Sequence, residues 1–399
     1  MGLPTTNVST GAAPSWKKFS FPSGLTEAIG IAFTDETTGY LAGGGNGVGP
    51  EILQSTDGAK SFNPIDGINF GIDILLLDAA ASKNTVIVTS IGGELYSLDK
   101  GKSWRHSFGG GLSQSVRYIG HLDQGDGLHF GIAGQHKQQQ GVAITTNGGI
   151  SFTSYNAGLT TLSRYGAYPT QSTWYVSAGS FPNPPPPPPP MGSKSPKFQR
   201  ARKFELQNPD GTWNVNAYKT PVGSGDGYAA EIAKTTDSGR TWKTLFSDNG
   251  TFYFNEIDCF DEKTCCAAGE SAGSAVPGVR IYCTSDGETW TKNFEQDSEP
   301  GKASYTMMGL NFVSATEAWA CGGKISLFPV PLFWHTVDGG KTWTQDTGAV
   351  GMDGSICLGM EMKSASVGFA ALDNVGTQSA GVGKYTSEPA PPPSQPSQL

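Results

Sequence analysis

Short apolar stretches separated by polar turns run along the chain and predict pairs of antiparallel β-strands. Residues 29–33 and 39–43 form one such pair, and residues 308–312 and 318–322 form another. In both pairs the second stretch ends in or beside a glycine-rich segment. Most of these pairs are followed by a further strand and a sharper polar phrase. The pattern therefore predicts an all-β fold built from a repeated unit.

The polar phrase reads Ser/Thr-x-Asp-x-Gly-x-Ser/Thr-Trp/Phe, and it occurs six times, starting at residues 55, 97, 145, 235, 284 and 336. The acidic or amide residues of the six copies are Asp57, Asp99, Asn147, Asp237, Asp286 and Asp338, and the aromatic residues are Phe62, Trp104, Phe152, Trp242, Trp290 and Trp343. Ala59 stands where glycine is expected in the first copy, and the fifth copy is one residue shorter. Such self-similarity outranks local propensity when a fold is predicted.

Each copy of the phrase predicts a tight β-hairpin. The carboxylate can accept hydrogen bonds from backbone N–H groups of its own turn, and the glycine supplies a positive φ. The aromatic residue then starts the next strand and buries its ring beside the neighbouring sheet. This position puts the aspartates on the outer rim, so we expect them to be structural and not catalytic.

The whole unit comprises four antiparallel strands, which is one blade of a β-propeller. Residues 356–362 and 368–372 open a further blade that has no repeat phrase, and residues 16–21 can supply its missing outer strand. This overlap would close the ring and remove open sheet edges. We therefore predict seven blades. An eight-bladed alternative would place two blades in the long third interval, but the proline run 184–190 cannot form a ladder strand.

These predictions divide the chain into four parts. Residues 1–15 form a leader, residues 16–385 form the propeller, and residues 386–399 form an extended proline-rich tail. Residues 182–227 form an insertion in the fourth blade, with the proline run followed by a hairpin.

Composition and charge exclude some classes of function. Glycine is frequent, with 55 of 399 residues, and the net charge is −8 without a basic stripe, so nucleic-acid binding is not expected. The longest aliphatic run, residues 74–77, is far too short to cross a bilayer. The first residues lack the apolar core of a signal peptide, and we read the start as left by trimming of a precursor.

The repeated phrase resembles the Asp-box, or bacterial neuraminidase, repeat of β-propellers. Its pairing with a preceding Ala-Gly strand is most similar to the photosystem II stability/assembly factors, and the resemblance covers about residues 16–385 apart from the insertion. It implies a propeller that binds a client protein without catalysis. Sialidases, xyloglucan hydrolases and sortilin receptors are more distant, because the chain has no Arg-Ile-Pro phrase, no second propeller and no cysteine-rich trailer.

A carbohydrate-active propeller is the main alternative, either a glycoside hydrolase or a lectin with its site at the axial opening. A glycosidase needs two facing carboxyl groups about 5–10 Å apart. The sequence selects no pair among its candidates, which are Asp73, Asp78, Asp123, Asp126, Asp258, Asp261, Glu317 and Glu361.

Metal and cofactor sites are not predicted. His121, His129 and His136 lie near Asp123 and Asp126, but their spacing matches no metal-ligand motif. We expect these histidines to be solvated or to belong to hairpins.

The six cysteines point to an oxidising compartment. Cys259 and Cys265 flank an acidic turn that resembles the hairpin clasp of secreted Asp-box propellers. Cys266 can meet Cys283 on the next strand, which leaves Cys321 and Cys357 as a third pair. The sequons at Asn7 and Asn249 agree with secretion, and we therefore expect an extracytoplasmic location.

The insertion carries a basic cluster beside the proline run, formed by Lys194, Lys197, Arg200, Arg202 and Lys203. One interpretation is a docking arm for an acidic partner, and the other is a solvated linker. Our leading hypothesis is a non-enzymatic binding or assembly propeller that uses one ring face and the arm to dock a protein partner.

Overall fold

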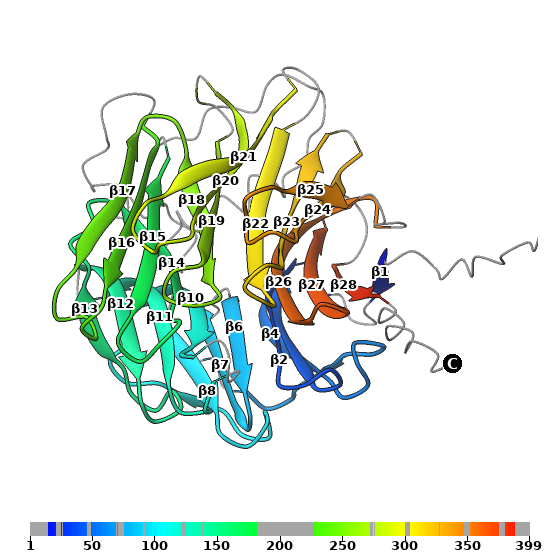
Figure 1. Cartoon of the computed structure of the whole chain (residues 1–399). Helices are drawn as coiled ribbons and strands as arrows, with labels where there is room; N and C mark the ends of the chain where they lie inside the picture. Colours follow the sequence, from blue (N-terminus) through cyan, green and yellow to red (C-terminus); the bar gives the residue numbers. More distant parts are fainter. Residues whose placement is uncertain are drawn as a thin grey trace, which may run out of the picture.

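The protein forms a ring of seven four-stranded antiparallel sheets around a central axis (Figure 1). The computed structural model describes residues 15–20, 25, 27–45, 49–68, 70, 76–90, 93–120, 125–136, 139–181, 227–271, 274, 276–299, 304–326, 328–346, 352–374 and 380–387. These residues form strands and turns and include no α-helix, so the all-β prediction is confirmed. Nor do they include a helix with the length and apolar character that crossing a bilayer requires.

The first four blades follow the chain in order, each from its innermost to its outermost strand. Blade 1 is β2 (Glu27–Phe33), β3 (Gly39–Gly45), β4 (Gly49–Ser55) and β5 (Asn63–Pro64); blade 2 is β6 (Leu76–Ser82), β7 (Thr85–Ser90), β8 (Gly93–Ser97) and β9 (Arg105–His106); blade 3 is β10 (Leu112–Tyr118), β11 (Phe130–His136), β12 (Gln139–Thr145) and β13 (Thr153–Asn156); blade 4 is β14 (Leu162–Ala167), β15 (Trp174–Ser180), β16 (Ala229–Thr235) and β17 (Lys243–Asn249).

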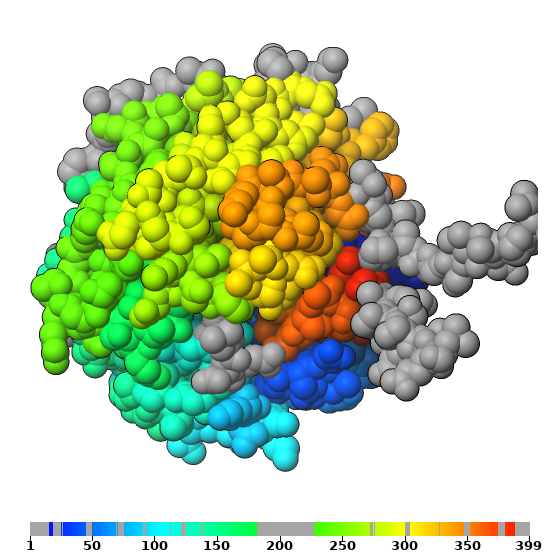
Figure 2. Space-filling model, viewed as in Figure 1, coloured from blue at the N-terminus to red at the C-terminus, as the bar shows by residue number. Residues whose placement is uncertain are grey.

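The last three blades complete the ring. Blade 5 is β18 (Tyr253–Cys259), β19 (Cys265–Ser271), β20 (Gly278–Thr284) and β21 (Thr291–Asp297); blade 6 is β22 (Ser304–Phe312), β23 (Ala318–Ile325), β24 (Val330–Thr336) and β25 (Thr344–Asp346); blade 7 is β26 (Ser355–Ser364), β27 (Val367–Asn374), β28 (Gly381–Thr386) and β1 (Ser15–Ser20). Figure 2 shows the blades in sequence order around the ring, with the blue first blade beside the orange and red last blade. The seven-blade prediction is confirmed.

The ring is closed by β1, which is the outermost strand of the last blade. Trp16 lies opposite Tyr385 of β28 and is completely buried. Its indole stacks on Phe333 of blade 6, with the ring centroids 4.0 Å apart, and meets Trp319 edge-on. The first strand of the chain therefore fills the place that a repeat phrase fills in the other blades, as the sequence predicted.

The six repeat phrases form turns that share one hydrogen-bond pattern. In the second copy the Ser97 hydroxyl donates to Asp99 and accepts the N–H of Gly101, and Asp99 accepts the N–H and hydroxyl of Ser103. The other five copies repeat this pattern of hydroxyl, acid or amide, and backbone N–H. These hydrogen bonds lower the pKa of Asp57, Asp99, Asp237 and Asp338 to about 2 and also lower the pKa of Asp286.

The fifth residue of each full-length phrase adopts a left-handed backbone conformation. Gly101 has φ 79° and Gly340 has φ 83°, values that favour glycine. Ala59 adopts φ 67° at the same place in the first copy, so it follows the turn despite its side chain. The turn is therefore determined by its hydrogen bonds as well as by glycine.

The aromatic residue of each phrase lies between its own blade and the preceding one. Phe62, for example, belongs to a core cluster with Phe33 of blade 1 and Phe369 of blade 7. The remaining residues occupy the equivalent interfaces, where Trp104, Phe152, Trp242, Trp290 and Trp343 contact apolar side chains from two successive blades. Trp16 does the same between blades 6 and 7. Each interface thus receives one ring from an outermost strand or the turn before it.

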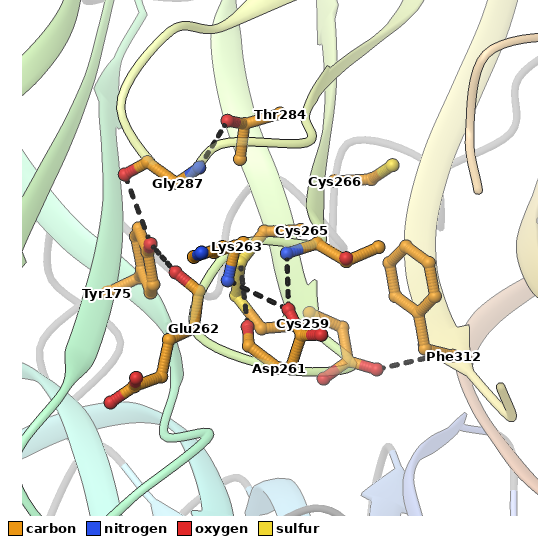
Figure 3. The surroundings of a disulfide bond; sticks show 12 residues. Tyr175, Cys259, Asp261, Glu262, Lys263, Cys265, Cys266, Thr284, Gly287 and Phe312 are labelled. Carbon is orange, nitrogen blue, oxygen red and sulfur yellow. Dashed lines mark hydrogen bonds between the residues drawn. A yellow bond between two sulfur atoms is a disulfide. The ribbon is translucent and has the colours of Figure 1, made fainter. Parts of the chain in front are cut away.

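All six cysteines form disulfide bonds, in the pairs considered from the sequence: Cys259–Cys265, Cys266–Cys283 and Cys321–Cys357. The first clasps the β18–β19 hairpin, where Asp261 accepts the N–H groups of Lys263 and Thr264 (Figure 3). Tyr175 of blade 4 donates its hydroxyl to the Glu262 carbonyl at 2.7 Å and so ties this turn to the neighbouring blade. Three disulfides in one chain indicate an oxidising environment.

Most of the residues that were predicted to lie outside the blades are not among the residues that the structure describes. The leader before Ser15, the insertion from residue 182 to residue 226 and the tail after residue 387 lie outside the described ranges. The basic cluster Lys194, Lys197, Arg200, Arg202 and Lys203, together with Asn7, lies there too.

Trp16→Ala should destabilise the ring strongly. The change removes a fully buried indole from the interface between blades 6 and 7, so we expect a loss of about 3–5 kcal/mol in the free energy of unfolding, measured with urea. Phe328→Ala is the control, because that ring is 76 % exposed and its loss should change stability by no more than about 0.5 kcal/mol. Equal effects of the two substitutions would show that β1 does not close the ring.

Candidate functional site

The innermost strands of all seven blades carry a β-bulge at the same position, and this shapes the ring axis. In β18, for example, the register with β19 shifts between Phe254 and Glu256. The corresponding shifts occur in the other six blades at Ala28/Gly30, Leu76/Asp78, Ser113/Ser115, Ser163/Tyr165, Met307/Gly309 and Cys357/Gly359. A bulge changes the direction of the side chains that follow it. In β18 it leaves both Glu256 and Asp258 lining the axial pocket.

The axial pocket is a small polar cavity of about 50 Å³. The charged and polar side chains that line it come from six blades and are Asp78, Arg117, Tyr118, Tyr165, Tyr168, Glu256, Asp258, Asn311 and Glu361. One water needs roughly 10–15 Å³ of such a volume, so the cavity has room for a few water molecules.

Three polar residues of the pocket link successive blades by hydrogen bonds to the backbone. The Asp258 carboxylate accepts the N–H of Phe312 at 2.8 Å, and the Asn311 side-chain oxygen accepts the N–H of Met362 at 2.8 Å. Glu361 accepts the N–H of Phe33 at 2.5 Å. These bonds join blade 5 to 6, 6 to 7, and 7 to 1. The side chains therefore act as connections between inner strands.

The residue types at one repeated position of the inner strands explain why the axis is hollow. Asp258, Asn311 and Glu361 each stand three residues after the bulged residue of their strand. The same position holds alanine in three other blades, at Ala32, Ala80 and Ala167. In blade 3 it holds Arg117. The short alanine side chains leave the space into which the guanidinium extends.

Arg117 donates hydrogen bonds to two carboxyl groups in the pocket. Its guanidinium lies 2.6 Å from Asp78 and 2.8 Å from Glu256, and both carboxyl groups are buried. Burial raises the pKa of Asp78 and raises that of Glu256 to about 8, against the attraction of Arg117. Asp78 also accepts the N–H groups of Ala79 and Val116 at 2.9 Å. Asp78 is therefore the better site for the negative charge, and Glu256 holds the proton at neutral pH.

The tyrosines of the pocket are uncharged. Burial raises the pKa of Tyr118, Tyr165 and Tyr168 well above the ordinary value for the phenol group. The pocket thus combines one permanent cation with several carboxyl groups and neutral hydroxyls. A pair of carboxyl groups that differ in proton affinity is the chemical element that a general acid and base require.

The candidate carboxylates from the sequence fall into two groups. Asp78, Asp258 and Glu361 line the axial pocket. Asp126, Asp261 and Glu317 do not, which corrects their placement at the axis: Asp126 and Asp261 each accept two N–H groups of their own turn, and Glu317 contacts His335 at 2.9 Å. Asp73 and Asp123 lie outside the described residues.

Arg117 and Glu256, which contact each other in the pocket, were not among the residues predicted from the sequence. Glu256 precedes Asp258 by two residues on the same strand, a spacing that places two side chains on one face. Alignment of the seven inner strands on their bulges would have placed Arg117 at the Asp258 position. That alignment needs the register shifts, which the sequence does not display.

The two described histidines of blade 3, His129 and His136, lie at different places. His129 contacts Asp126 in the turn before β11, His136 is buried at the far end of that strand, and His121 lies outside the described residues. Within the described ranges no three His, Cys, Asp or Glu side chains are arranged to hold a metal ion. Asn249, a candidate for glycosylation, ends β17 with an exposed side chain.

Glu256→Gln should change how stability depends on pH. The folded protein keeps the Glu256 proton up to a pH of about 8, whereas the unfolded chain releases it near the ordinary pKa of 4.5. The unfolded state therefore binds fewer protons in this window, and the wild type loses stability as the pH rises from about 4.5 to about 8. Glutamine cannot ionise, so the variant should gain stability over the wild type with rising pH, by up to about 1.4 kcal/mol per pH unit.

Urea unfolding at several pH values within this window measures the effect. Glu36→Gln, in an exposed turn, is the matched control and should follow the wild-type curve. Parallel curves for the wild type and Glu256→Gln would show that Glu256 titrates as an ordinary carboxyl group.

Comparison with solved structures shows similarity to propellers of different activities. The chain is similar to YCF48 bound to a D1 peptide, with a TM-score of 0.58 and 12 % identity over 94 % of this chain and 97 % of that one. It is also similar to the GH74 xyloglucanase from Xanthomonas campestris, with a TM-score of 0.52 and 14 % identity over 89 % of this chain. The match covers 52 % of that enzyme, so this chain spans about half its length. No protein-family model matches the chain, and no curated protein matches its sequence. At these identities the likeness shows the fold alone.

Proposed function

We propose that this chain is a non-enzymatic binding propeller that docks a protein partner on its surface. The observation that carries the proposal is the state of the axial carboxylates. Asp258 and Glu361 accept backbone N–H groups of the next blade, while Asp78 and Glu256 share Arg117. Groups with these structural partners are poorly available to a substrate, and the cavity of about 50 Å³ between them has room for a few water molecules.

The comparison with YCF48 supports a protein partner. That propeller aligns with nearly the whole of this chain, and its structure holds a D1 peptide. A rigid ring with many surface turns is suited to such binding, because the turns can vary while the blades stay in place. The resemblance of the repeat phrase to the Asp-box of photosystem II assembly factor-like proteins points to the same function.

The disulfides and the turns support the finer parts of this assignment. The six repeat turns have the hydrogen bonds that an Asp-box phrase would need, and this favours the Asp-box interpretation. The three disulfides and the exposed Asn249 sequon favour secretion or an organelle lumen. The docking arm of residues 182–227 stays a prediction.

A glycoside hydrolase is the second candidate, and one observation favours it. Asp78 and Glu256 flank the same guanidinium, and the pKa of Glu256, raised to about 8, would suit a general acid. The fold of the xyloglucanase shows that a propeller of this kind can belong to a polysaccharide-degrading enzyme. This reading needs the pocket to open wider than it does here.

Parallel binding and activity assays separate the two candidates. The full chain, with its disulfides intact, is used to select from a displayed library of random linear peptides, and it is incubated with a polysaccharide panel that includes xyloglucan. We expect enrichment of specific peptides and no release of reducing sugar.

Two outcomes would overturn the proposal. One is polysaccharide turnover that Glu256→Gln abolishes and the exposed control Glu36→Gln retains, which would assign hydrolysis to the axial pocket. The other is a selection that enriches no peptide over several rounds, because a protein-docking propeller should capture some of them.

A further inference from the structure

Exposed apolar side chains gather at the junction of blades 2 and 3. The described residues include seven large apolar side chains with high exposure, and four of them belong to these two blades. They are Leu98, Phe108, Leu128 and Ile150, which we call the blade 2–3 patch. Phe108 is 71 % exposed and Leu128 is 50 % exposed. Such a concentration is unusual on the surface of a protein with no partner.

The contacts of the backbone place these four residues side by side. The N–H of Phe108 donates to the Ile150 carbonyl at 3.0 Å, and the N–H of Gly148 donates to the Leu128 carbonyl at 2.9 Å. A methyl group placed on Gly148 would lie 2.6 Å from Cδ2 of Leu98. Gly148 therefore separates Leu98 from Leu128, and Ile150 follows two residues later. The two blades are neighbours in Figure 1 and pack through β6, β7 and β10.

Comparison of the blades shows that Leu128 stands where the repeat is otherwise polar. In six blades, a residue of the turn after the innermost strand accepts a backbone hydrogen bond through its carbonyl. The donor is an N–H group of the repeat turn in five of these blades and the N–H of Ser387 in blade 7. Leu128 holds this position in blade 3. In the other five blades it is held by Thr37, Asn84, Ser172, Thr316 and Ser366.

Ile150 and Leu98 are also apolar at positions where most other copies of the phrase have a polar residue. Ile150 follows the glycine of its phrase, and the residues at its place in the other full-length copies are Lys60, Lys102, Arg240 and Lys341. Leu98 is the second residue of its phrase, where four other copies have Thr56, Thr146, Thr236 and Ser285. Val337 of blade 6 is the further apolar exception. The turn tolerates polar residues at all three positions, so folding does not require these apolar ones.

Several cations lie near the patch, in space or in the chain. Lys83 lies beside Gly127, with its Cβ 3.4 Å from the place of a methyl group on that glycine, and Lys100 is two residues from Leu98. Arg105 of β9 lies opposite Tyr96 of β8, and it stands three residues before Phe108 in the chain. None of the side chains Lys83, Lys100, Lys102 and Arg105 forms an ion pair with another residue in the described ranges.

The acidic residues near the patch are already engaged. Asp99 accepts hydrogen bonds from Ser97 and Ser103, and Asp126 accepts the N–H groups of Leu128 and His129. The patch is thus apolar, and the charged side chains near it are the four cations Lys83, Lys100, Lys102 and Arg105 against the two carboxylates Asp99 and Asp126, in a chain whose net charge is −8. This charge excess attracts an acidic partner and opposes contact with a second copy of the same patch.

We propose that the blade 2–3 patch binds an acidic peptide segment that carries apolar side chains. The apolar residues of the segment cover Leu98, Phe108, Leu128 and Ile150, and its carboxylates face the lysines and Arg105. This inference rests on the proposed function, since it specifies where the propeller holds its protein partner and what that partner must look like.

The double variant Leu98→Thr/Leu128→Thr tests the patch, because both threonines occur at the same positions of other blades. Peptides selected with the wild-type chain should combine acidic and apolar residues. A synthetic peptide of this kind should bind the double variant at least about tenfold more weakly, measured by fluorescence polarisation or calorimetry. Val337→Thr is the matched control, since it makes the Leu98 type of change in blade 6, and it should keep wild-type affinity.

The charge component has its own variant. Lys83→Glu/Lys100→Glu should weaken binding of the same peptide and reduce the dependence of its affinity on salt. Thermal unfolding of each variant shows whether the ring is intact. Wild-type affinity in the threonine double variant would overturn the inference, as would selected peptides that are basic.

The controls distinguish this failure from failure of the proposed function. If the peptides bind the wild type and both patch variants equally, the propeller binds proteins elsewhere. If no peptide is selected, the proposed function fails and the inference fails with it. Self-association of the wild type that Leu98→Thr/Leu128→Thr abolishes would assign the patch to a second copy and also overturn the inference.

Discussion

Each sheet of this protein has two apolar faces, and both must be covered by neighbouring sheets. The structure meets this constraint by arranging seven sheets in a closed ring, so that no terminal face is left exposed to water. Every interface holds one apolar cluster with an aromatic ring contributed from the outer part of a blade. The repeat turns, the bulges and the axial hydrogen bonds all serve to hold the sheets at the spacing that these clusters need.

Much of the ring could be predicted from the sequence because its signals are local. The hydrogen bonds of the Asp99 turn join residues that lie within six positions of each other, so the phrase carries its own geometry. The role of β1 followed from the count of strands, since the last blade lacked an outer one. The axial site is different in kind. Arg117 meets Glu256 across 139 positions, and the bulges that bring them together are set by strand register, which no short phrase displays.

The axis and the rim of the ring have different physical roles. At the axis, the carboxyl groups are buried, and backbone N–H groups and one arginine satisfy them. Removing such a side chain for another purpose would leave unpaired groups in the interior. At the rim the turns are exposed, and substitutions cost little there. A propeller with this architecture can therefore change its surface chemistry blade by blade while its centre stays the same.

The position of β1 has a consequence for how the molecule is made. This strand is made before the other strands of the ring, yet its partner β28 is the last of the described strands to be synthesised. Until β28 is made, the apolar cluster that buries the Trp16 side chain is incomplete, and the facing sides of the first and last blades remain uncovered. The nascent protein must therefore pass through an open, arc-shaped stage that exposes apolar surface, and it can leave this stage only after β28 has been made. Closure of the ring thus reports that translation has reached the end of the final blade.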